Sequence, residues 1–136
     1  MKRQMITPES VKARQYEQMH FSSATRVGDM IWVSGQVGFD AARGEPGEGM
    51  AEQARLAFQN LKNVLAEAGA TMADIVEIMT FHTDLRGPDI HAFVQVKDEF
   101  LPDRYPSWTA VGVAQLANPA FLVEVRAIAV AGCGAD

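Results

Sequence analysis

The last strongly apolar stretch of the sequence carries two charged residues. Glu124 and Arg126 lie among hydrophobic neighbours between Phe121 and Ala131. A carboxylate on an apolar surface is costly unless it is paired or has a chemical role. Because residues two apart on a strand point to the same face, Glu124 can form an ion pair with Arg126, and it can also accept a proton in a reaction. The two interpretations are compatible, and the sequence leaves both open.

The histidines and the cysteine give weaker signals. His20, His82 and His91 lack the spacing of metal ligands, and no Cys-x-x-Cys pair accompanies them, so no metal site is expected. His82 shares a predicted strand face with apolar residues, which favours a satisfied, partly buried histidine over a catalytic base. Cys133 is the single cysteine, so an intramolecular disulfide is impossible and a bystander thiol in a reducing compartment is expected.

Composition limits the classes of protein that the chain can represent. It has 136 residues, 48% of them hydrophobic, which suits a single domain, residues 1–136, with one core. No apolar run approaches the roughly 20 residues that span a bilayer, and no secretory signal is recognised at the N-terminus, so a cytoplasmic location is expected. The net charge of −5 makes binding to nucleic acid unlikely on electrostatic grounds.

Two helices are expected to position these groups. Apolar residues recur at i, i+3 and i+4 over residues 49–68, and Gly69 then supplies the stop signal. The opposite side of this helix carries charged and amide side chains, as expected when one side faces water. A second helix is predicted to begin at residues 87–89, where proline favours the first turn, and to end at Pro102.

Strands are expected where β-branched and aromatic residues gather between Gly, Pro or Asp. The four clearest segments and a weaker fifth are Met30–Gln36, Ile75–Asp84, Ser107–Val113, Phe121–Ala131 and Gln4–Thr7.

Both faces of the predicted strands are apolar. On the last strand Val123 and Ile128 point to opposite sides. On the predicted strand Ile75–Asp84, Ile75 shares one face with Met79 while Val76 takes the other. Two helices can cover one face of a single sheet, and a wet second face would show cleaner alternation of polar residues. A second copy of the chain is therefore expected to cover the other face.

Four segments together resemble the RidA/YjgF family of reactive-intermediate deaminases. The resemblance runs in the right order and spacing over residues 17–131. The segments are Val27–Gln36 (VGDMIWVSGQ), Gln53–Gly69 (QARLAFQNLKNVLAEAG), Tyr105–Val111 (YPSWTAV) and Leu122–Ala129 (LVEVRAIA).

This resemblance implies a chorismate-mutase-like α+β fold. In that fold a mixed, mostly antiparallel sheet carries two helices on one face, and three subunits form a homotrimer with a small-molecule ligand in each intersubunit cleft. The best-known subgroup hydrolyses reactive enamines and imines to 2-oxo acids and ammonia, with no metal and no organic cofactor. The resemblance thus implies an imine or enamine deaminase; the alternatives are a non-catalytic small-molecule-binding or regulatory trimer and, more weakly, an endoribonuclease.

Several site positions depart from the family pattern. An arginine in the C-terminal signature binds the substrate carboxylate in that subgroup, and the matching residue here is Trp108, which offers a single N–H donor and no charge. Phe21 stands where a tyrosine is usual. Altered substrate preference is therefore expected.

The resemblance also implies roles for the remaining site residues. Ser34, before Gly35 in the Ser-Gly-Gln motif, and Glu124 match positions that touch ligand or water. Glu124 is predicted to orient or deprotonate a hydrolytic water and Ser34 to donate a hydrogen bond. Gly35 and Arg126 are predicted to contact substrate. Trp108 and Phe21 are expected either to stack on a planar ligand or to fill a subunit interface as core aromatics.

Overall fold

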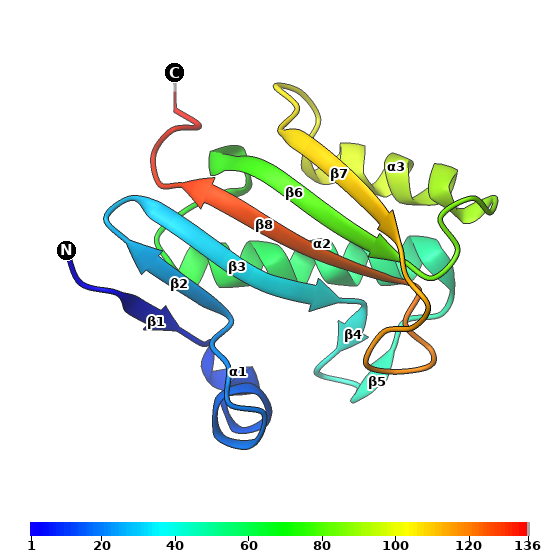
Figure 1. The fold of residues 1–136 in the computed structure, drawn as a ribbon, viewed down its shortest axis with the longest axis horizontal. Coiled ribbons are helices and arrows are strands. Elements are labelled where there is room, and N and C mark those ends of the chain that lie inside the picture. Colours follow the sequence, from blue (N-terminus) through cyan, green and yellow to red (C-terminus); the bar gives the residue numbers. More distant parts are fainter. Residues whose placement is uncertain (136) are drawn as a thin grey trace.

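Six strands form one mixed sheet in the order β1-β2-β3-β8-β6-β7 (Figure 1). The computed structural model describes residues 1–135, so the last residue of the predicted 1–136 domain lies outside the described part. β6 and β7 run parallel, and the other neighbouring strands pair antiparallel. The strands are β1 (Gln4–Ile6), β2 (Ala24–Val27), β3 (Met30–Val37), β6 (Ile75–His82), β7 (Ser107–Gly112) and β8 (Val123–Val130).

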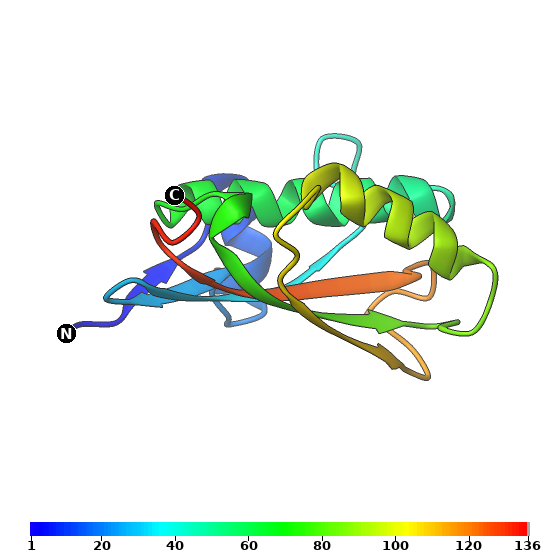
Figure 2. The ribbon, with the colours of Figure 1, turned by 90° about the horizontal axis from the view of Figure 1, so that it is seen from above.

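Two helices pack on the same face of this sheet, as Figure 2 shows edge-on. α2 (Gly49–Glu67) buries the apolar stripe that the sequence predicts, and α3 (Asp89–Phe100) follows Pro88. Gly69 ends the first helix with a φ of +84°, a conformation that glycine adopts readily. The core forms between α2 and the inward residues of the central strand, such as Val123 and Val125, which are fully buried. The predicted α+β architecture with two helices on one face is confirmed.

The other face of the sheet is free of helices and is called the uncovered face below. Glu124, Arg126 and Ile128 point to it from β8, in alternation with the buried residues of that strand. Trp32 of β3 pairs with Ile128 on this face and is 37% exposed. Both faces of β8 are thus apolar apart from one acid and one base, as the sequence indicates.

One predicted side-chain orientation is wrong. Ile75 is buried with Ile78 on the helix-covered side, and Val76 is 40% exposed, whereas strict alternation assigns Ile75 to the face of Met79. A register shift between Ile75 and Glu77 in the pairing with β8 explains the difference. An irregularity of this kind adds a residue to one strand and reverses the alternation beyond it.

Several short elements escape the sequence prediction. A short helix, α1 (Glu9–Lys12), continues into a π-helical turn, η1 (Ala13–Gln18), and β2 adds a strand beside β3. A small hairpin, β4 (Phe39–Asp40) with β5 (Glu45–Pro46), lies between β3 and α2, and a 3₁₀ turn, η2 (Met72–Asp74), precedes β6.

Two amide side chains of α2 tie the ends of the strands to that helix. Asn60 donates from Nδ2 to the carbonyl oxygens of Val37 and Phe39 at 3.0 and 3.1 Å, where β3 ends. Gln53 is buried, donates to the Ala120 carbonyl at 2.7 Å and accepts from the Leu122 amide at 2.8 Å. These hydrogen bonds satisfy backbone groups after β3 and before β8, and so they hold the adjoining loops against one end of the sheet.

Within the described residues no helix is both long and apolar enough to cross a membrane.

Candidate active site

A cavity of about 460 Å³ opens beside the second half of β3, next to the start of β2. β2 pairs with β3 over Met30–Val33, so the second half of β3 forms one wall of the cavity instead of continuing the ladder on that side. The other walls come from η1 and the segment that follows it, from one side of α2, and from the loop before β8. A cavity of this size falls in the range of roughly 300–1,000 Å³ that accommodates small-molecule ligands.

Two charged residues and three aromatic residues line this cavity among the described residues. The charges are those of Arg14 and Glu124, and the rings are those of Phe21, Phe39 and Phe121. Amide side chains, including those of Asn60 and Asn118, contribute to the remaining surface. One cation, one carboxylate and aromatic walls suit a planar ligand that carries a negative group and undergoes proton transfer.

The Glu124 carboxylate is half-buried, and burial raises its pKa above the ordinary value. Within residues 1–135 it forms no ion pair or hydrogen bond, so nothing near it in the chain offsets the loss of hydration. A carboxylate whose pKa is raised is a stronger base than an ordinary one, and its acid form returns the proton. Its environment therefore suits acid–base chemistry.

The ion pair between Glu124 and Arg126 that the sequence allows is absent from the described chain. Arg126 pairs in register with Met79 of β6 and points to the same uncovered face as Glu124, but outside the cavity lining. Its proposed contact with substrate thus depends on a ligand or another chain that reaches this face.

Gly35 allows the close approach of the Glu124 carboxylate. The register of β3 against β8 shifts between Val33 and Gln36, and beyond the shift Glu124 pairs with Val37. The Glu124 side chain extends over Gly35, two residues before Val37. A Cβ atom added at residue 35 would lie 2.8 Å from Glu124 Cγ, closer than such atoms approach in real structures. Glycine is needed here for space, so that the carboxylate can lie over the β3 backbone.

Ser34 uses its hydroxyl proton within the chain. Its Oγ donates to the Ser22 carbonyl at 2.8 Å, and its amide donates to the Ser23 carbonyl at 2.8 Å. These two bonds fix the segment that carries Phe21 against β3. In this arrangement Ser34 can still accept a hydrogen bond from a ligand, while its donor capacity is already engaged.

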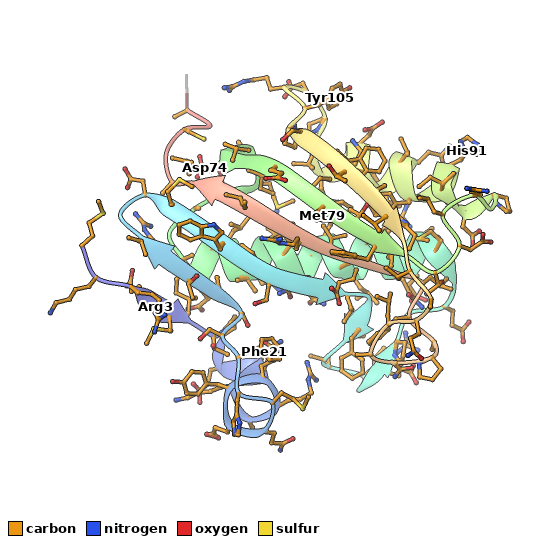
Figure 3. The ribbon with its side chains drawn as sticks, viewed as in Figure 1. Arg3, Phe21, Asp74, Met79, His91 and Tyr105 are labelled. Carbon is orange, nitrogen blue, oxygen red and sulfur yellow. The ribbon has the colours of Figure 1, made fainter. Side chains whose placement is uncertain are left out.

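Trp108 lies at the opposite edge of the sheet from Phe21. It pairs in register with Ile78, its ring packs against Phe93 at 5.9 Å between centroids, and its Nε1 donates to Thr80 Oγ1 at 2.9 Å. Figure 3 shows Phe21 beside η1 and Tyr105 at the far edge, just before β7. One chain therefore does not bring Trp108 and Phe21 together, and a stacking site made of both would need a second chain.

Two further polar residues surround Trp108. The Lys97 ammonium is buried and lies 5.2 Å from the Trp108 ring centroid and 5.3 Å from that of Tyr105, an arrangement typical of cation–π contacts. His82 Nε2 lies 2.7 Å from Thr80 Oγ1, and burial lowers the pKa of His82. The buried, hydrogen-bonded His82 agrees with the structural role expected from the sequence.

Sequence reasoning missed the cavity residues on η1 and on the polar side of α2. Arg14 lies on a turn without an apolar stripe, so its segment gave no periodic signal. Pro8 before Glu9 is a helix-start signal that could have identified it. Asn60 lies beside the apolar stripe of α2 and lines the cavity, and an amide at this position of the stripe is the signal that could have identified it. Across the described chain, no group of three His, Cys, Asp or Glu side chains could hold a metal ion.

The fold and this arrangement of residues define a class of α+β proteins with known members. The model of the family described as "Endoribonuclease L-PSP" matches residues 12–131. RutC family protein YjgH of Escherichia coli (strain K12) is 44% identical over 115 residues, which cover 84% of this chain and 85% of that protein. The 2-iminobutanoate/2-iminopropanoate deaminase of Dermatophagoides farinae is 34% identical over 111 residues, covering 81% and 84% of the two chains.

A solved structure supports the same relationship. The structure described as "Protein YJGH" superposes with a TM-score of 0.84 at 39% identity and covers 96% of this chain and 98% of that one. The chain belongs to the RidA/YjgF family, and the membership expected from its sequence motifs is confirmed.

Proposed function

We propose that this protein is an imine or enamine deaminase that hydrolyses C=N intermediates to oxo compounds and ammonia. The observation that carries the proposal is the half-buried Glu124 carboxylate, which faces the cavity without a partner and has a raised pKa. The name of the Dermatophagoides farinae relative, a deaminase of 2-imino acids, supports the same reaction class. Position 108 carries tryptophan in place of the arginine that the family resemblance implies, so we infer a different substrate preference.

The reaction can be followed atom by atom at Glu124. The protonated Glu124 carboxyl group gives its proton to the enamine carbon, and an iminium ion forms. A water oxygen then bonds to the iminium carbon while the Glu124 carboxylate accepts a water proton, which it passes to the nitrogen. The C–N bond breaks as the C=O bond forms, the carboxylate takes the hydroxyl proton, and ammonia leaves with Glu124 protonated again. A carboxyl group with a pKa nearer neutrality is suited to these proton transfers.

We propose further that the protein acts as a homotrimer in the cytoplasm. The uncovered face supports association, because Met30 and Trp32 are 38% and 37% exposed and lie beside Ile128 and Val130. Apolar area left in water costs on the order of 25 cal/mol for each Å², which favours its burial against other copies. In such an assembly ligands would bind near the intersubunit clefts that the family resemblance implies.

A direct test measures ammonia release from imines generated in situ by an amino-acid oxidase acting on small, branched and aromatic amino acids. We expect wild-type protein to accelerate release from the larger substrates, because the cavity of about 460 Å³ exceeds what a few-carbon imine fills. Glu124→Gln serves as the control. Equal release with and without wild-type protein for every substrate would contradict the proposal.

A second function, non-catalytic binding of a small molecule, is favoured by one observation. The Ser34 hydroxyl proton is engaged by Ser22, and so it is withheld from a ligand. A binding protein would show a rise in melting temperature with the same compounds and no ammonia release. Ribonuclease activity has less support, because the described cavity lining contains no histidine or lysine and the net charge is −5.

A further inference from the structure

Arg14 is the cation of the cavity, and its charge is not used within the described chain. Arg26, Arg43 and Arg55 each form an ion pair with a neighbouring carboxylate. Arg14 instead lies over an aromatic ring, with its guanidinium carbon 4.8 Å from the centroid of Phe39. No carboxylate of residues 1–135 pairs with Arg14, although both it and Phe39 line the cavity.

The backbone around Arg14 is anchored to the cavity wall. The Met19 amide donates to the Arg14 carbonyl at 3.2 Å and closes the π-helical turn, and the Phe21 amide donates to the Gln15 carbonyl at 3.1 Å. Ser23 Oγ also donates to Gln15 Oε1, which ties the turn to the start of β2. π-helical turns often occur at functional sites. The backbone that carries Arg14 is therefore fixed by bonds to the same segment that carries Phe21, and the Phe39 ring contacts the guanidinium.

A guanidinium stacked on a ring keeps its N–H groups available. The donors lie in the guanidinium plane and point sideways, away from the ring face that the group covers. A carboxylate can then approach in that plane and accept two parallel hydrogen bonds, a geometry that ammonium groups do not offer. With its guanidinium carbon over the Phe39 ring at the cavity, Arg14 is available to such a ligand.

We propose that Arg14 binds the carboxylate of the substrate from within the same chain that supplies Glu124. The inference rests on the proposed function, and it identifies the substrate class as 2-imino acids with an aromatic or conjugated body. The body of the ligand would lie along the rings of Phe21 and Phe121, and the size of the cavity leaves room for it. Arg14 would thereby replace the carboxylate contact that the family resemblance places at residue 108.

The test uses product-like ligands, so that it does not depend on turnover. Binding of phenylpyruvate is compared with binding of phenylacetone, which has the same ring but lacks the carboxylate, by calorimetry at about 0.15 M salt to screen distant charges. We expect wild-type protein to bind phenylpyruvate more tightly. Arg14→Gln should weaken phenylpyruvate binding about ten- to a hundredfold and leave phenylacetone binding unchanged.

Three variants serve as controls. Lys12→Gln removes a positive charge from the adjoining helix outside the cavity lining and should bind phenylpyruvate like wild type. Arg14→Lys keeps the charge without the two-pronged geometry and should recover part of the affinity. Arg126→Gln tests the other candidate carboxylate partner and should weaken phenylpyruvate binding less than Arg14→Gln does.

Four results would overturn the inference. They are absent binding of phenylpyruvate to wild type, wild-type affinity in Arg14→Gln, equal weakening of both ligands, and a larger loss in Arg126→Gln. The ammonia assay separates this inference from the proposed function. Arg14-dependent binding without turnover would contradict the deaminase assignment alone, whereas turnover that needs Glu124 and ignores Arg14 would contradict the inference alone.

Discussion

Glu124 combines a cost in stability with a chemical use. Its carboxylate loses hydration at the cavity wall without gaining a hydrogen bond or an ion pair in the described chain, and the raised pKa expresses that cost. Groups in strained or unfavourable surroundings gather at functional sites, where removing them stabilises the fold and abolishes activity.

Glu124→Gln should therefore separate stability from turnover. Because burial raises the folded-state pKa above the unfolded value of about 4.3, wild type loses stability as pH rises through the interval between the two values. At pH 7 the variant should have an equal or greater free energy of unfolding, and the difference should vanish below about pH 4. Urea titrations at both pH values, combined with ammonia release, test this. A variant that is less stable at pH 7 would indicate an unrecognised partner of the carboxylate.

Trp108, which departs from the family pattern, is held in place by contacts with its neighbours. Its indole donates to Thr80 and lies beside the buried Lys97 ammonium. Trp108→Arg would place a second cation next to Lys97 and leave Thr80 without its donor. We expect a loss of about 1–3 kcal/mol in unfolding free energy. No gain in turnover of small imino acids is expected.

Trp108→Phe is the matched control, since it keeps a ring beside Lys97 and loses the hydrogen bond. Its expected loss is about 1 kcal/mol. Chemical denaturation of the three proteins measures both effects. If Trp108→Arg kept wild-type stability and gained activity, the side chain at this position would have to reach the ligand rather than α3.

The contact between β3 and β8 sets the position of the Glu124 carboxylate. Gly35→Ala would place a methyl group where the Glu124 side chain lies, and the flexible acid would be displaced from the cavity. We expect a fall in kcat of at least tenfold with a small change in melting temperature, because the far end of a side chain can move aside at little cost. Gly112→Ala, where an added Cβ atom would meet only ordinary contacts with Leu85 at 3.6 Å or more, controls for general effects of removing a glycine from a strand. Unchanged kcat in Gly35→Ala would show that the close approach is unimportant for the reaction.

The long elements could be predicted from the sequence, and the short ones could not. α2 and β8 have enough residues for their periodicity to be recognised, and their bounds differ from the predictions by one or two residues. β2 has four residues, two of them Thr25 and Arg26, so its pattern is weak, although Gly28-Asp29 before β3 is a hairpin signal.

The candidate site was predicted in part for the same reason. Glu124 and Gly35 lie on long strands with clear motifs, while Arg14 lies on a π-helical turn whose exposed residues carry no pattern. The place of Trp108 on the helix-covered side depends on the parallel pairing of β6 with β7, which brings Ile78 opposite Trp108. Pairing between strands far apart in sequence is not encoded in local periodicity.

A charge introduced on one face of β8 should affect the whole molecule differently from a charge introduced on the other face. Val125→Asp would bury a charge in the core beneath α2, and we expect it to unfold the chain. Ile128→Asp places the same charge on the uncovered face, so the chain should fold and lose its self-association. Light scattering should give about 44 kDa for wild type, three times the 14.8 kDa of one chain, and a monomer for Ile128→Asp. A wild-type monomer, or an Ile128→Asp trimer, would contradict this account of the uncovered face.

Arg14 and Glu124 come from one polypeptide, and this has a consequence for mass action. Self-association depends on protein concentration, but the distance between two groups of the same folded chain does not. If anionic ligands bind through Arg14, dilution below the dissociation constant of the assembly would release subunits that still hold both charges. Ligand capture would then persist in dilute protein, while any contribution from a neighbouring copy, such as Trp108 or Arg126, would fade with the assembly itself.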